Sequence, residues 1–115
     1  MVKSAKQMEK ELRERMRGGD GEVEIVHLLN KGEYQGQARM VAKIILKPGC
    51  SIGYHVHQQE EEIFYLLSGS AVYNDNGVEK TLGAGEVSIA TGGMGHAIKN
   101  TGDETVELLA VILTY

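Results

Sequence analysis

The chain has 115 residues, which is enough for one hydrophobic core but not for a second independent module. Its formal net charge is −4, and its basic residues beyond the N-terminal segment are scattered, which argues against a nucleic-acid partner. No stretch approaches the roughly 20 apolar residues that cross a bilayer, and the N-terminus lacks the apolar core of a secretory signal. We therefore expect a cytoplasmic protein with no membrane partner.

Residues 1–19 differ from the rest of the chain because they are dense in charge. Within them Met8, Leu12 and Met16 recur at a spacing of four residues, and two glycines follow. This pattern predicts a short N-terminal amphipathic helix that ends at the glycines. Because such a short helix is marginal alone, we expect its apolar stripe to dock on the remaining domain or on a second subunit.

Residues 20–115 are a succession of short apolar runs separated by turn signals. The 15 glycines are spread through the chain, and clusters such as Asn74–Gly77 fall between the runs. Repeated turn chemistry at short intervals predicts an all-β domain, an antiparallel sandwich or barrel. The clearest strand-length runs are Val23–Leu29, Ala38–Leu46, Ile63–Leu67 and Thr105–Leu113.

The sequence His55-Val56-His57 carries the strongest chemical signal. On an extended strand, successive side chains alternate faces, so His55 and His57 present two imidazoles to one volume. A carboxylate follows at Glu62, and a third imidazole comes much later at His96. Imidazole nitrogens and a carboxylate are ligands that several transition metals accept, so this pattern predicts a metal site.

The same residues lie in two motifs with fixed spacing. Gly49, His55, His57, Glu62 and Gly69 match the first motif of the cupin superfamily. The second motif is matched by Gly85, Gly92, Gly93, His96 and Asn100, with Thr91 where the family usually has Pro. The chain thus resembles a small single-domain cupin over about residues 40–113. The resemblance implies a jelly-roll β-barrel with His55, His57, Glu62 and His96 as metal ligands.

Three consecutive glutamates leave the carboxylate ligand open on spacing alone. Glu61 and Glu62 point to opposite faces of a strand, and the resemblance favours Glu62. An interpretation as a solvated loop residue is favoured for Glu60 over Glu62.

Other candidates receive structural interpretations. His27 matches no ligand position and is expected to be structural, and Cys50 is expected to be a small, partly buried hydrophobe. Asn100 is expected to satisfy backbone groups in a turn rather than to touch metal. No tyrosine is assigned a catalytic role, and the catalytic residues are left unknown.

Two functions follow from an open-sided metal site in a small barrel. The first is a metal-dependent enzyme that acts on a small carboxylate or other oxygen-rich molecule, by decarboxylation or dioxygenation. The alternative is a non-catalytic sensor or binding module for a metal or small ligand. The resemblance favours manganese or iron as the divalent ion and leaves zinc, nickel and copper open. Within the superfamily, the chain resembles small cupins of the oxalate decarboxylase type. The resemblance also implies a homodimer.

Overall fold

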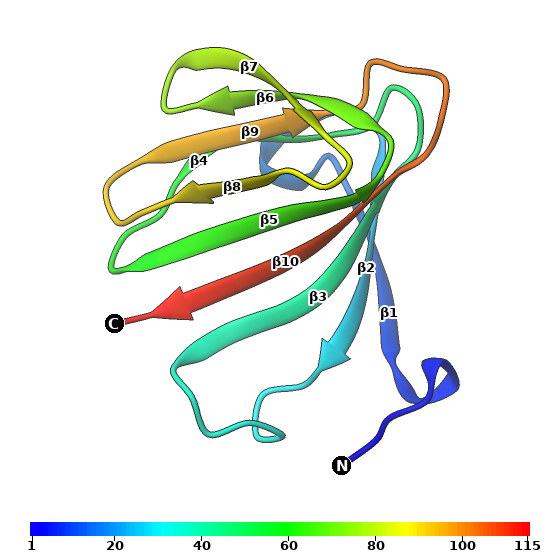
Figure 1. The fold of residues 1–115 in the computed structure, drawn as a ribbon, viewed down its shortest axis with the longest axis vertical. Helices are drawn as coiled ribbons and strands as arrows, with labels where there is room; N and C mark the ends of the chain where they lie inside the picture. The colour runs from blue at the N-terminus through cyan, green and yellow to red at the C-terminus, as the bar shows by residue number, and fades with distance from the viewer.

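Two antiparallel β-sheets pack face to face in the computed structural model, which describes residues 1–115 (Figure 1). One sheet has six strands in the order β1-β2-β3-β10-β5-β8, and the other has four in the order β4-β9-β6-β7. The predicted all-β jelly-roll fold is confirmed. The strands are β1 (Glu9–Glu14), β2 (Glu22–Leu29), β3 (Ala38–Leu46), β4 (Ser51–Val56), β5 (Glu60–Ser68), β6 (Ser70–Asp75), β7 (Val78–Gly83), β8 (Val87–Ala90), β9 (Gly95–Lys99) and β10 (Val106–Thr114).

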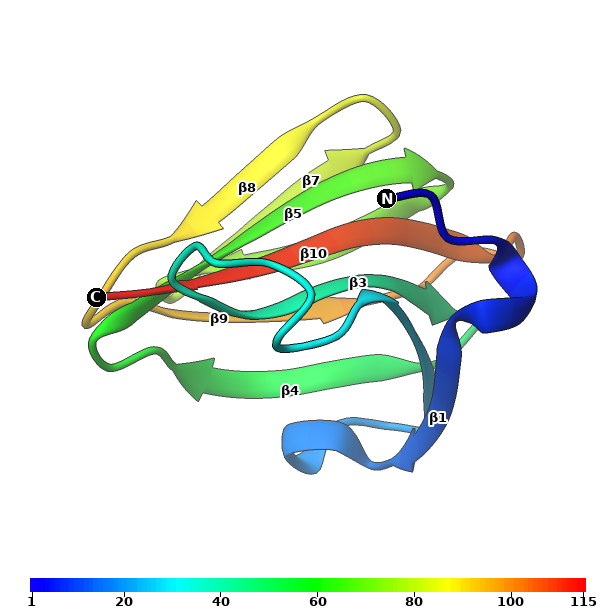
Figure 2. The same ribbon diagram turned by 90° about the horizontal axis from the view of Figure 1, so that it is seen from below.

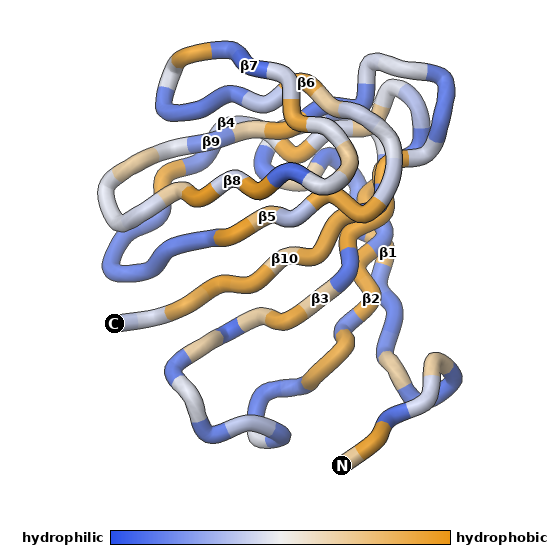
Figure 3. The backbone as a smooth tube through the Cα atoms, viewed as in Figure 1, coloured by the Kyte–Doolittle hydropathy of each residue, from blue (hydrophilic) through white to orange (hydrophobic).

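The core lies between the two sheets and is supplied by alternate strand residues. Along β3 and β10, buried side chains alternate with partly exposed ones, as the period of two requires. Figure 3 shows the hydrophobic colour running along most of β10. Phe64 and Leu66 of β5 are among the buried residues, and full burial of each such side chain contributes about 1.5–3 kcal/mol. The cluster contains 17 buried residues from both sheets.

The prediction of a helix within residues 1–19 is wrong. This segment instead forms β1, which pairs with the edge of β2 over six residue pairs, flanked by the single-turn 3-10 helices η1 (Ala5–Gln7) and η2 (Met16–Gly18). A spacing of four places Met8, Leu12 and Met16 on one face of an extended strand as well as of a helix. Pairing with the open edge of β2 therefore decides the conformation over a weak helical preference.

Two predicted turns are confirmed. Asn76 and Gly77 both have positive φ, +51° and +99°, and form the two-residue connection between β6 and β7 that such residues favour. Asn100 is fully buried, donates hydrogen bonds to the backbone oxygens of Leu46 and Glu104, and accepts one from the Gly102 N–H. Its expected structural role is thus confirmed.

None of the helical segments is long and apolar enough to span a membrane.

Candidate metal centre

Four polar side chains converge in the interior between the two sheets. His55 lies on β4, His57 follows directly after it, and His96 lies on β9, where it pairs in register with His55. Glu62 reaches them from β5 in the opposite sheet. His57, Glu62 and His96 are at most 4% exposed. The structure therefore brings together the four residues that the sequence singled out.

The ligand atoms of these four side chains lie within 4.8 Å of one another. Glu62 Oε1 is 3.0 Å from His96 Nε2, 3.1 Å from His57 Nε2 and 3.7 Å from His55 Nε2. The Nε2 atoms of His57 and His96 are 3.0 Å apart. Three imidazoles thus turn the same ring nitrogen toward one carboxylate oxygen.

The opposite ring nitrogen, Nδ1, of each histidine has its own polar partner, which fixes the ring orientation. These partners are the Gly53 carbonyl oxygen for His55 at 2.8 Å, the Tyr73 hydroxyl for His96 at 2.8 Å, and the Glu60 carboxylate for His57 at 3.4 Å. With Nδ1 engaged, Nε2 is left to face the centre. The three rings are held as they would be to bind one ion.

Apolar packing supports the same arrangement. Phe64 stacks on the ring of His96 with their centroids 4.9 Å apart and an interplanar angle of 19°. Tyr73 meets the same ring edge-on, at 5.6 Å and 85°. His96 is therefore fixed on two sides by aromatic side chains that exclude water.

The electrostatics of the cluster favour an anionic Glu62. Burial by itself would raise the pKa of Glu62, but hydrogen bonds to His55, His57 and His96 outweigh it and hold the pKa far below its usual range. The hydrogen bond to Glu62 raises the pKa of His57, whereas burial lowers the pKa of His96. These directions favour a proton on His57, hydrogen-bonded to the anionic Glu62, and a metal ion would displace that proton.

The donor set fits a divalent transition metal ion. Ligand atoms about 3.0 Å apart match the spacing of adjacent ligands around an ion that binds each of them at about 2.0–2.2 Å. Two nitrogens 3.0 Å apart cannot both present lone pairs to each other without a cation or proton between them. This buried group of three His and one Glu could therefore hold one metal ion.

The structure also places the other sequence candidates. Glu62, not Glu61, joins the histidines, because the side chains of neighbouring strand residues point to opposite faces. The interpretation of Glu60 as a solvated loop residue is wrong, since it lies beside His57 and pairs with Arg39 at 2.8 Å. His27 lies outside the cluster and contacts Glu11 at 2.7 Å, as expected for a structural residue.

A small cavity of about 30 Å³ adjoins this cluster of three His and one Glu. Its inner wall is formed by His55, His57 and Glu62. The remaining wall combines long apolar side chains with three arginines, and these residues are Met16, Met40, Ile44, Ile52, Ile112, Arg13, Arg17 and Arg39. Its arginines make this cavity a candidate site for a small anion.

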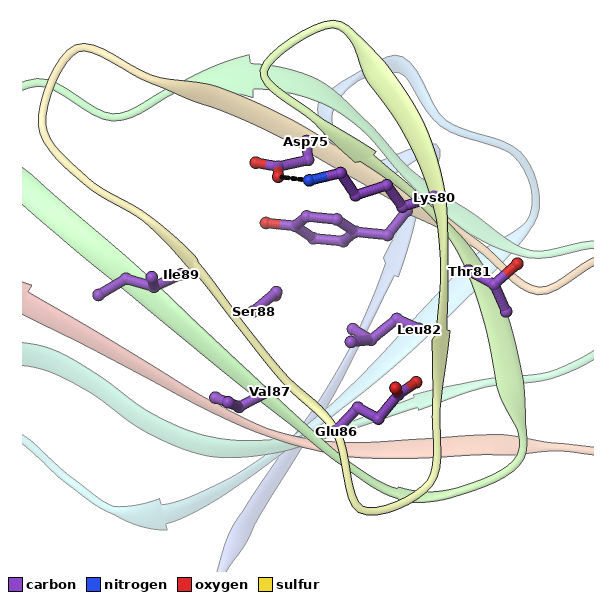
Figure 4. Close-up of a pocket in the computed structure, with 9 residues that line it drawn as sticks. Asp75, Lys80, Thr81, Leu82, Glu86, Val87, Ser88 and Ile89 are labelled. Atoms are coloured by element: carbon purple, nitrogen blue, oxygen red, sulfur yellow. Dashed lines mark hydrogen bonds and ion pairs between the residues drawn. The ribbon is translucent and has the colours of Figure 1, made fainter.

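A second, larger cavity of about 350 Å³ lies on the far side of Tyr73, between β7 and β8 (Figure 4). Figure 4 shows the Asp75 carboxylate paired with Lys80, at 2.7 Å, on one side of this cavity and Ser88 on another. The Ser88 Oγ atom is buried without a hydrogen-bond partner. Burial raises the pKa of Tyr73 to about 12, so its hydroxyl keeps its proton between this cavity and His96.

Comparison with known proteins agrees with the fold and the site. The cupin domain family matches residues 42–112, which span all of the proposed ligands. The chain belongs to the cupin family. This cupin thus carries its cluster of three His and one Glu where the sequence motifs implied it.

Three relatives illustrate the range of similarity. This cupin is 47% identical over 98 residues to the oxalate-binding protein of Thermotoga maritima, covering 85% of this chain and 81% of that protein. A crystal structure of a protein from the same organism, described as a predicted oxalate decarboxylase, superimposes with a TM-score of 0.95 at 43% identity over the full length of both chains. A tetracenomycin polyketide synthase protein of Streptomyces glaucescens is 33% identical, covering 66% of this chain and 51% of that protein.

Sequence reasoning missed the residues that surround the ligands. Tyr73 was one of five tyrosines without a role, and Arg13, Arg17 and Arg39 lie far from the motifs in sequence. Their positions depend on strand register and on the path of β1, for which the sequence offers no local signal. Of this site, the sequence predicted only the four residues of the cluster.

Proposed function

We propose that this cupin binds one divalent transition metal ion through His55, His57, Glu62 and His96 and captures a small carboxylate anion beside it. The observation that carries the proposal is the convergence of these ligand atoms beneath a cavity edged by three arginines. The 47% identity to an oxalate-binding protein supports oxalate as the first ligand to test.

Manganese or iron is our proposal for the ion, following the resemblance to metal-dependent cupins. The set of three nitrogens and one oxygen also accepts zinc, nickel or copper. A divalent ion bound there would supply a Lewis-acid site with a net positive charge. The tightly held imidazoles favour one coordination geometry, because Gly53, Glu60 and Tyr73 restrain the rings.

Binding, rather than turnover, is the function that the cavity supports best. Decarboxylation requires a group that delivers a proton to the carbon that loses carbon dioxide. Apart from the proposed ligands His55, His57 and Glu62, the side chains around the cavity are arginines, methionines and isoleucines, which attract an anion and exclude water but do not change protonation. We therefore place the binding function first and make decarboxylation an outcome of the experiment below.

We also infer a homodimer, through the outer face of the six-stranded sheet. Tyr65 and Leu67 on β5, with Val87 and Ile89 on the neighbouring β8, are 40–64% exposed on that face. A second copy would cover this apolar surface. Light scattering at micromolar concentration should give twice the chain mass, and Leu67→Lys should shift it toward the monomer.

The metal can be tested by elemental analysis of protein purified without chelating resin. We expect about one transition metal ion per chain in the wild type and His27→Ala, and loss of the ion in His55→Ala. His27→Ala is the matched control because it removes an imidazole outside the cluster. Equal metal content in all three proteins would contradict the proposed site.

Ligand capture is tested with the metal-loaded protein. Calorimetry should show oxalate binding that disappears in the metal-free protein. Mass spectrometry of the same samples should recover oxalate unchanged, whereas accumulation of formate would identify a decarboxylase instead.

A further inference from the structure

The three arginines beside the metal-ligand cavity come from separate parts of the chain. Arg13 lies on β1, Arg17 in η2, and Arg39 on β3. Two of them are already paired with carboxylates: Arg13 with Glu11 at 3.1 Å, and Arg39 with Glu60 at 2.8 Å. Arg17 takes part in none of the ion pairs, and its side chain makes no hydrogen bond to another residue of the chain. Of the three arginines that line the cavity, Arg17 is thus the one whose charge is not paired with a carboxylate of the chain.

The backbone around Arg17 is held in a conformation that arginine rarely adopts. Arg15 and Arg17 have φ of +50° and +55°, in the left-handed region that favours glycine. Such a conformation persists only where the surrounding structure enforces it, and it often occurs at ligand sites.

Hydrogen bonds enforce the conformation of this turn. The Arg15 N–H donates to the Gly21 carbonyl oxygen at 2.9 Å, closing a loop around η2. Asp20 bridges to β4, because its carbonyl oxygen accepts from the Ser51 N–H at 2.9 Å and its own N–H donates to Ser51 Oγ at 2.8 Å. The turn is therefore attached to the strand that carries His55.

Close packing fixes the same contact. Figure 2 shows the η2 turn beside β4. Gly53 of β4 faces the Arg17 carbonyl group so closely that a Cβ on Gly53 would overlap it. The carbonyl oxygen of this same glycine accepts the hydrogen bond from His55 Nδ1. One residue thus contacts both the turn that carries Arg17 and a proposed metal ligand.

We propose that Arg17 binds the second carboxylate of a small dicarboxylate whose first carboxylate is held at the metal centre. This assignment rests on the proposed function. A divalent ion with the Glu62 carboxylate carries one net positive charge, and Arg17 adds a second, so the site matches a dianion. A guanidinium binds a carboxylate through two parallel hydrogen bonds, which a lone point charge does not. The small cavity favours the shortest dicarboxylate, oxalate, over longer ones.

The test measures oxalate and acetate affinities by calorimetry, with manganese-loaded wild type, Arg17→Gln and Arg17→Lys. The matched control is Arg15→Gln, which removes an exposed arginine of the same turn that does not line the cavity. We expect Arg17→Gln to weaken oxalate binding by about 10- to 100-fold and to leave acetate binding unchanged. Arg17→Lys should retain part of the affinity, and Arg15→Gln should match the wild type.

Metal content, measured on every variant, separates the possible failures. If Arg17→Gln holds its metal and binds oxalate as tightly as the wild type, the assignment of Arg17 is overturned and the proposed function stands. If metal-loaded wild type binds no oxalate, both are overturned. A parallel loss of oxalate and acetate binding in Arg17→Gln with full metal content would also overturn the assignment, because it would show that Arg17 does not select the second carboxylate.

Discussion

Removing the Tyr73 hydroxyl should weaken metal binding while leaving the fold intact. In Tyr73→Phe the aromatic ring remains, but His96 Nδ1 loses its 2.8 Å partner. His96 is fully buried and Tyr73 is 3% exposed, so water cannot easily replace the hydroxyl. An unsatisfied buried polar group costs about 1–3 kcal/mol.

The corresponding loss in metal affinity follows from this free-energy cost. Since 1.4 kcal/mol corresponds to a factor of ten, we expect the metal Kd to rise by about 10- to 100-fold, a range typical of partners that orient metal-bound histidines. Competition with a chelator of known affinity would measure the change. Because burial raises the pKa of the Tyr73 hydroxyl to about 12, the expected effect does not depend on titration of Tyr73 near neutral pH.

The matched control is Tyr34→Phe. It also removes a hydroxyl, one that donates to the Ala38 carbonyl oxygen at 3.1 Å and lies outside the group of proposed ligands, so it should leave metal affinity unchanged. Equal metal affinity in Tyr73→Phe and the wild type would refute the argument that this hydroxyl positions His96.

Three further outcomes can be measured on the same protein. Glu60→Gln should weaken metal binding, by less than Tyr73→Phe because its contact with His57 is 3.4 Å long, and a larger loss in the chelator assay would contradict this order. Gly53→Ala should lower the free energy of unfolding by about 1–3 kcal/mol in denaturant titrations, whereas Gly36→Ala, which faces open space, should have little effect. Hydrogen bonds from Arg13 and His27 lower the pKa of Glu11, so it stabilises the fold above the ordinary carboxyl pKa of 4.5, and this contribution is lost as pH falls through the lowered value. Glu11→Gln should therefore show a smaller loss of stability on acidification, and an unchanged pH profile would argue against this contribution.

The sequence by itself determined the strands β2, β3, β5 and β10 and the identity of the proposed ligands. Apolar alternation in β3 and β10 is local, and Asn76-Gly77 specifies its own turn, because each depends on a few neighbouring residues. His55 and His57 share a face for the same reason. The resemblance to cupins supplied His96 and favoured Glu62, whose convergence the structure shows.

Only the tertiary structure decided what surrounds those ligands. The open edge of β2 turned a predicted helix into β1, which brings Arg13 and Arg17 to the cavity. The pairing of β6 with β9 places Tyr73 behind His96, and the approach of η2 to Gly53 fixes the Arg17 turn against β4. These contacts join residues that are distant in sequence, and their free energy depends on the register and packing of whole strands. No local pattern encodes them, so the ligands could be read from the sequence whereas the groups proposed to select a small anion could not.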